Sequence, residues 1–218
     1  MTRPALSVVP SAPADVAELG RRFRDGDRAA FGALVEPHMD ALYTLCLRVL
    51  GRPADAEDVA QEALERALRA HRSFDPQRSF RVWLYTIAVN RCRDRMRGPW
   101  WSRVLRVEHP VGDSVPSCAE QVERADTDAA VRAALATLPA IYREALSLYH
   151  LGDLGYAEMS EIIGVGQGAL KQRVLRGREM LRESVVRLYP GLAVERMKET
   201  EGALGPCSEP DDRGSPAR

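Results

Sequence analysis

The feature that most constrains the fold is a pair of amphipathic segments between residues 155 and 186, GYAEMSEIIGVGQGALKQRVLRGREMLRESVV. Apolar residues of the first segment recur at helical spacing and can share one face. They are Tyr156, Met159, Ile162 and Ile163. Gly164 follows, and glycine readily adopts the left-handed conformation that ends a helix. The pattern predicts two short helices joined by a sharp turn.

The second segment begins near Gly166 and is predicted to bury Leu170, Val174, Leu175 and Leu181. Its other faces carry polar and basic residues, namely Gln167, Lys171, Gln172, Arg173, Arg176, Arg178 and Arg182. A basic helix after a short turn is the geometry of a helix-turn-helix that enters a DNA major groove. Basic surface helices also occur in bundles without any nucleic-acid role. This segment alone does not distinguish a DNA-binding helix-turn-helix from a helical bundle, so features elsewhere in the chain are needed.

Charge is balanced overall but separated along the 218-residue chain. Lys plus Arg and Asp plus Glu each number 31, so net charge gives no sign of nucleic-acid binding. Residues 91–106 are rich in arginine, whereas residues 55–65 and 199–212 are acidic. Segregated charge favours separate electrostatic partners for separate segments.

Other classes of protein find little support in the sequence. No apolar run approaches the roughly 18 residues of a membrane span, and the N-terminus does not resemble a secretory signal. Cys46, Cys92, Cys118 and Cys207 form no metal-ligand spacing with the histidines. We therefore expect reduced thiols, a cytoplasmic protein, and neither metal nor cofactor. No acid–base pair, nucleophile constellation or phosphate-binding glycine loop is visible, so we do not expect an enzyme.

The N-terminal half is predicted to be helical. A first helix starts near Val16 and breaks at Gly26, and RDGDRAAFGALVEPHMDALYTLCLRVLG follows, with Pro37 marking a kink or a new first turn. DAEDVAQEALERALRAH, residues 55–71, has an apolar stripe opposite a polar face. That face carries Asp58, Gln61, Glu62, Glu65, Arg66 and Arg69. It either docks a basic partner or is simply solvated.

A loop built around Asp75-Pro76 leads into a third long helix, FRVWLYTIAVNRCRDRMRG. Arginines crowd its second half, and aromatic residues stand at its start. Rings that stack on bases beside guanidinium groups that neutralise phosphates suit single-stranded or distorted DNA. The rings of Phe80 and Trp83 fit a hydrophobic core equally well, and for Trp83 we favour the core.

No strand pattern is present, so we expect an all-α protein of two small helical domains joined by a flexible linker. The predicted boundaries are a disordered N-terminus (1–14), a first domain (15–98), a linker (99–119), a second domain with the helix-turn-helix (120–189) and a disordered acidic tail (190–218).

Four segments, in order, resemble bacterial RNA polymerase sigma factors of the extracytoplasmic-function group of the sigma-70 family. They are DGDRAAFGALVEPH, DAEDVAQEALERALRA, FRVWLYTIAVNRCRDRMR, and LPAIYREALSLYHLGDLGYAEMSEIIGVGQGALKQRVLRGREML. The resemblance implies a factor that binds core RNA polymerase and directs promoter-specific initiation. It also implies two DNA partners, double-stranded promoter DNA and the melted −10 strand, and an anti-sigma factor.

The resemblance assigns roles to individual residues. Core polymerase would contact Asp55, Asp58, Gln61, Glu62 and Glu65. The −10 element would be held by Phe74, Arg78, Phe80, Asn90, Arg93 and Arg97. The −35 element would be read by Gln167, Lys171, Gln172, Arg173, Arg176 and Arg178. At Ser160, Gly166 and Ala169 the chain departs from the residues usual in this family.

Two other functions compete with this reading. A stand-alone helix-turn-helix regulator would usually need a dimer, yet no heptad or dimer helix is visible, and the acidic DAEDVAQE segment would lack a purpose. A nucleic-acid-processing enzyme has no catalytic residues to support it. Target promoters, the inducing signal, the anti-sigma partner and the role of the tail with Cys207 do not follow from the sequence.

Overall fold

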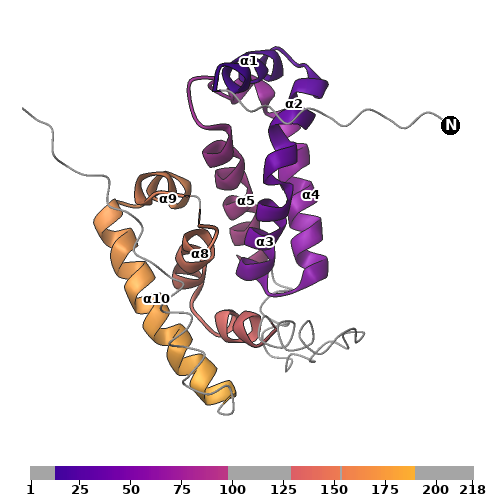
Figure 1. Ribbon diagram of the computed structural model, residues 1–218. Coiled ribbons are helices and arrows are strands. Elements are labelled where there is room, and N and C mark those ends of the chain that lie inside the picture. The colour runs from indigo at the N-terminus through magenta and orange to yellow at the C-terminus, as the bar shows by residue number, and fades with distance from the viewer. Residues whose placement is uncertain (1–12, 98–128, 153, 190–218) are drawn as a thin grey trace, which may run out of the picture.

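The computed structural model describes residues 13–97, 129–152 and 154–189. These residues are helical or in turns and contain no strand, so the predicted all-α class is confirmed (Figure 1). The predicted linker and tail lie outside the described residues, as does the N-terminus up to residue 12. Helix α1 already begins at Pro13, three residues earlier than the sequence pattern indicates.

The first helical unit comprises α1 to α5. Its elements are α1 (Pro13–Arg24), α2 (Arg28–Val35), η1 (Glu36–His38), α3 (Met39–Leu50), α4 (Pro53–Arg69), η2 (His71–Ser73) and α5 (Phe80–Arg97). Asp27 starts α2, because its carboxylate accepts the backbone N–H of Ala29 at 2.8 Å. Pro37 opens the 3-10 turn that separates α2 from α3, as expected. Gly51 ends α3 in the left-handed conformation, with φ of 79°.

An aromatic cluster fills the end of this unit where α1, α2 and α5 meet. Phe23 is fully buried at its centre. Its ring lies 5.1 Å from Phe31, 5.7 Å from Phe74, 5.8 Å from Phe80 and 5.9 Å from Trp83, measured between ring centroids. Tilted and edge-on ring pairs at these separations are favourable beyond the area they bury. The cluster therefore fixes the loop between η2 and α5 onto the first helix.

The second unit contains a helix over residues 129–136, then α8 (Ala140–Tyr149), α9 (Tyr156–Ile163) and α10 (Gln167–Leu188). Gly164 ends α9 with φ of 79°, which confirms the predicted turn. The Ser160 hydroxyl donates to the carbonyl of Val165 and braces that turn. Gly177 lies where α10 crosses α8, and a Cβ there would stand only 3.0 Å from Leu146 Cγ. Close packing of the two helices therefore leaves little room for a larger side chain at position 177.

The prediction that Leu175 is buried is wrong. Its side chain is 57% exposed, whereas Leu170 and Val174 are buried as expected. Helices α8 and α9 cover the face of α10 that carries Leu170, Val174 and Gly177. Leu175 is one residue beyond Val174, about 100° further round the helix, and points away from that face. Leu181 is half-buried against the core.

The two units pack directly on each other. Helix α8 lies between α10 and the first unit and contacts α3, while α9 contacts α5 (Figure 1). One continuous cluster of buried apolar side chains runs through both units, from Phe23 to Val174. Sequence periodicity indicates each helix but not this contact, because the contact joins residues far apart in the chain.

The turn glycine gives a direct test of the second unit. We expect Gly164→Ala to lower the free energy of unfolding by about 1–2 kcal/mol, since an alanine Cβ opposes the left-handed conformation. Gly168→Ala is the matched control, because Gly168 lies inside α10 with open space around it and without a positive φ. It should stabilise the protein by about 0.4–1 kcal/mol. Urea unfolding of both variants measures the difference, and equal effects would contradict the role of Gly164.

Candidate nucleic-acid and polymerase interface

The residues expected to hold a melted strand do not share one environment. Phe74 and Phe80 are 3% and 5% exposed, because both rings belong to the aromatic cluster around Phe23. In this conformation neither ring is available for stacking on a base, in contrast to the sequence expectation. Asn90 and Arg97 are exposed on the second half of α5. Arg78 and Arg93 are bound to glutamates of the second unit.

Arg93 and Glu144 form the best-defined ion pair between the units. Arg93 Nε lies 3.0 Å from Oε1 of Glu144, and Arg93 Nη2 lies 2.7 Å from Oε2. Glu144, on α8, is 3% exposed. The same Nη2 donates to the carbonyl of Ile163, the last residue of α9, at 3.2 Å. Two parallel charge-assisted bonds make a strong and directional contact.

Two further ion pairs connect α9 to the start of α5 and to the loop that precedes it. Arg81 Nη2 lies 2.8 Å from Glu158 Oε1, and Arg78 pairs with Glu161. Sequence reasoning did not single out Arg81, Glu144, Glu158 or Glu161. Their partners are 51 to 83 residues away in the chain, so no local pattern reveals the pairing.

Arg143 is a buried cation, 4% exposed, at the contact between α8 and α3. Its guanidinium donates to the carbonyls of Val49 at 3.0 Å, Ala136 at 2.9 Å and Leu138 at 2.8 Å. In the opposite direction, Arg48 of α3 donates a hydrogen bond to the carbonyl of His150, at the end of α8, at 3.1 Å. Carbonyls near helix C-termini lack helical partners and carry partial negative charge, so arginine satisfies them well.

The acidic row on α4 is exposed as predicted for four of its five members, Asp58, Gln61, Glu62 and Glu65. Arg95 of α5 reaches across to Glu62 at 2.9 Å and Asp58 at 3.6 Å. Asp55 differs from the others. It is only 5% exposed, because it lies beneath Arg95 at 3.2 Å and Arg52 at 3.4 Å. Asp55 is therefore placed to hold Arg95 rather than to meet a partner.

The helix-turn-helix presents its basic residues on the outer side of α10. Gln167, Lys171, Gln172 and Arg176 are exposed, whereas Arg173 and Arg178 are half-buried. The Arg178 guanidinium lies 5.1 Å from the centroid of the Tyr149 ring, and Lys171 Nζ lies 5.5 Å from that of Tyr156. Both distances suit cation–π contacts, which orient the cations on α10.

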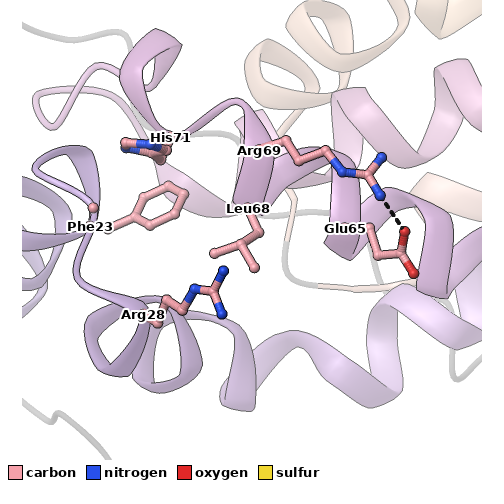
Figure 2. Close-up of a pocket in the computed structure, with 7 residues that line it drawn as sticks. Phe23, Arg28, Glu65, Leu68, Arg69 and His71 are labelled. Carbon is pink, nitrogen blue, oxygen red and sulfur yellow. Dashed lines mark hydrogen bonds and ion pairs between the residues drawn. The ribbon is translucent and has the colours of Figure 1, made fainter.

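A shallow cavity of about 520 Å³ opens beside the start of η2. Figure 2 shows Phe23, Leu68 and His71 around it, with Arg28 and the Arg69–Glu65 ion pair at its rim. His71 Nδ1 donates to the carbonyl of Arg24 at 3.0 Å, which ties η2 to α1. The cavity therefore marks where the loop before α5 is anchored.

Within the ranges 13–97, 129–152 and 154–189, no group of histidine, cysteine or carboxylate side chains is arranged to hold a metal ion. Over the same ranges, no helix combines the length and apolar character needed to cross a membrane.

Comparison with known proteins identifies the family. The family model for Sigma-70 region 2 matches residues 34–102, and the family model for Sigma-70, region 4 matches residues 128–181. The ECF RNA polymerase sigma factor SigW of Bacillus subtilis is 34% identical over 178 residues, which cover 76% of this chain and 94% of SigW. The RNA polymerase sigma-H factor of Pseudomonas aeruginosa is 31% identical, over 75% of this chain and 90% of its own length.

Solved structures agree with these matches. CnrH, solved in complex with the cytosolic domain of CnrY, superposes with a TM-score of 0.58 at 27% identity, covering 78% of this chain and 96% of CnrH. The sigma factor RpoE of Bartonella quintana, solved with the anti-sigma factor NepR, gives a TM-score of 0.54 at 26% identity. That match covers 69% of this chain and 93% of RpoE.

His150, at the end of α8, makes the contact between the units sensitive to pH. Burial, together with the nearby positive charges of Arg48 and Arg178, lowers its pKa from 6.5 to about 4. The folded protein keeps this ring neutral while the unfolded chain protonates it, so the stabilisation is complete above pH 6.5 and is lost toward pH 4. We expect the stability difference between wild type and His150→Gln to shrink as pH falls from 6.5 toward 5. Urea unfolding across this range measures it, and parallel curves would contradict the assignment.

Proposed function

The chain belongs to the extracytoplasmic-function group of sigma-70 factors, and we propose from this premise how its two helical units divide the work. Like its relatives, the protein is a sigma factor that binds core RNA polymerase and directs promoter-specific initiation. The first unit, within residues 15–98, would dock on core polymerase and hold the −10 element. The second, within residues 120–189, would read the −35 element. The stand-alone regulator is not favoured, because the relatives match the chain across both units.

The observation that carries the proposal is that the protein has two separate exposed surfaces of opposite charge. An acidic row lies on α4, and a basic face lies on the outer side of α10. A DNA-binding protein alone needs only the second, whereas a factor that delivers polymerase to DNA needs both.

On α4 we assign core polymerase binding to Asp58, Gln61, Glu62 and Glu65, with Asp55 holding Arg95 from below. At the −10 element, Arg78, Arg93 and Arg97 would bind phosphates and Asn90 a base edge. Phe74 and Phe80 would support the loop through the aromatic cluster. On α10, Gln167, Lys171, Gln172 and Arg173 would read bases, while Arg176 and Arg178 would bind phosphates.

The protein would perform no chemistry of its own, since the polymerase supplies catalysis, and it would need no cofactor. We infer that it works in the cytoplasm, where polymerase and promoter DNA are found. We also propose an anti-sigma partner, because the similar sigma factor RpoE was solved with the anti-sigma factor NepR, and CnrH was likewise solved with a second chain, the cytosolic domain of CnrY. Run-off transcription with core polymerase on the promoter of its own gene tests the function directly, and the absence of a promoter-dependent product when this protein is added would contradict it.

Glu62→Lys tests the docking surface. Reversing a charge at a partner interface brings like charges together, so we expect the variant to lose most affinity for core polymerase and most promoter-dependent transcription. The half-exposed pair with Arg95 should contribute only about 0–1 kcal/mol, so the fold should survive. Glu179→Lys makes the same charge change on exposed α10 and should keep core binding. Native core affinity for Glu62→Lys would show that the row is merely solvated.

Arg173→Ala tests base reading by α10. We expect it to reduce discrimination between the −35 element and random duplex by about 1–3 kcal/mol if the guanidinium contacts a guanine. Arg176→Ala, on the exposed side, should weaken binding to all sequences and flatten the dependence on salt. Fluorescence anisotropy with both duplexes separates the two effects. Equal losses on specific and random DNA for Arg173→Ala would remove its reading role.

A further inference from the structure

Three glutamates of the second unit pair with arginines of the first, and two of these arginines, Arg78 and Arg93, belong to the proposed −10 surface. Glu144 binds Arg93, Glu158 binds Arg81, and Glu161 binds Arg78. We propose, building on the −10 role assigned above, that these glutamates form an internal mimic of DNA phosphates. In the free protein the mimic withholds the −10 surface from DNA.

The contacts have the chemistry of phosphate binding. A carboxylate presents two oxygens to a guanidinium much as a phosphate does, and Glu144 uses both on Arg93, at 2.7 to 3.1 Å. Glu158 and Glu161 are three residues apart and so lie on one face of α9. Together the glutamates engage the loop before α5, the start of α5 and its second half. A single strand following this surface would have to displace them.

Arginine contacts to helix ends hold the mimic in place. Arg143 of the second unit reaches the carbonyl of Val49 at the end of α3, and Arg48 of the first reaches that of His150 at the end of α8. Arg93 similarly binds the last carbonyl of α9. Each unit therefore supplies cations to the helix ends of the other, which orients α8 and α9 against α3 and α5.

Closure affects the two DNA-binding surfaces differently. The outer side of α10, with Gln167, Lys171, Gln172 and Arg176, remains exposed in the same conformation. Charge pairing therefore does not cover every basic surface of the protein. The closed form should still bind duplex DNA through α10 while its −10 surface is occupied.

The ion pairs between the glutamates and the arginines are weak enough for the contact between the two units to open reversibly. Arg78 and Glu161 are 64% and 46% exposed, and solvent screens such a pair. Arg81 and Glu158 are half-buried, and only Glu144 is removed from water. A partner that binds the open form more tightly can therefore shift the equilibrium toward it.

The double variant Glu158→Gln/Glu161→Gln tests the mimic in the full chain without polymerase. Glutamine keeps the shape of each side chain, and at position 158 it still accepts the N–H of Gly155 that caps α9. We expect the variant to bind a fluorescein-labelled oligothymidine about tenfold more tightly, the gain from losing two weak competing pairs. Its affinity for random duplex should stay unchanged.

Glu18→Gln/Glu179→Gln is the matched control. It removes the same two negative charges away from the contact between the units, where Glu18 pairs with Arg21 and Glu179 is exposed. Oligothymidine affinity should then rise far less than in the double variant at 158 and 161. Small-angle scattering provides a second measurement, and the radius of gyration should increase only for the variant at 158 and 161.

Equal oligothymidine affinities for the two double variants would overturn the mimic. So would a variant that opens in scattering without gaining affinity, because the glutamates would then be structural only. Run-off transcription by the wild type separates this result from the proposed function. If the wild type directs initiation while the variant at 158 and 161 gains nothing, only the mimic fails.

Discussion

Arg143 is the constraint on which the arrangement of the two units depends. A guanidinium that is 4% exposed loses its water and must find acceptors within the protein, and burial lowers its pKa. Two of its acceptors, Ala136 and Leu138, belong to its own unit, and the third is Val49 of α3. Separating the units leaves this cation short of one partner and returns the end of α3 to water. Arg48 and Arg93 likewise donate hydrogen bonds to backbone carbonyls at the ends of α8 and α9. The arrangement of the two units therefore depends on hydrogen-bond geometry as well as on apolar burial.

Local signals in the sequence predicted the helices and their ends, because they depend on neighbouring residues. Gly164 and Pro37 act as expected through backbone conformation alone. Predictions of which side chains are buried and which are exposed were less accurate, because burial depends on which distant segments of the chain cover a residue. Phe74 and Phe80 have the composition of a stacking platform but are needed to surround Phe23, and Asp55 continues the acidic row but lies beneath Arg95. Leu175 completes an apolar pattern that α8 and α9 do not reach.

The fold determines which of the balanced positive and negative charges form ion pairs. The 31 basic and 31 acidic residues do not simply cancel over the surface, because pairing is selective. Arginines just before α5, at its start and in its second half are paired with glutamates from α8 and α9. Among the described residues, Arg28, Arg72 and Arg176 have no ion-pair partner, and they lie beside the cavity at η2 and on α10. Selective pairing thus leaves some basic surfaces ready for DNA while others are held by the protein itself.

This distribution also suggests an order of events, resting on the functions proposed for each surface. Asp58 and Glu62 keep 65% and 50% of their side-chain surface exposed while the units are packed, so polymerase can reach α4 before anything opens. The outer side of α10 is equally accessible to duplex DNA. The glutamates on α8 and α9 are the component that has to move, since they pair with the arginines of the −10 surface. Binding to polymerase can drive that movement only by favouring the open form, because a ligand shifts a conformational equilibrium by its difference in affinity for the two states. Docking on α4 would therefore come first, and exposure of the −10 surface would be its consequence.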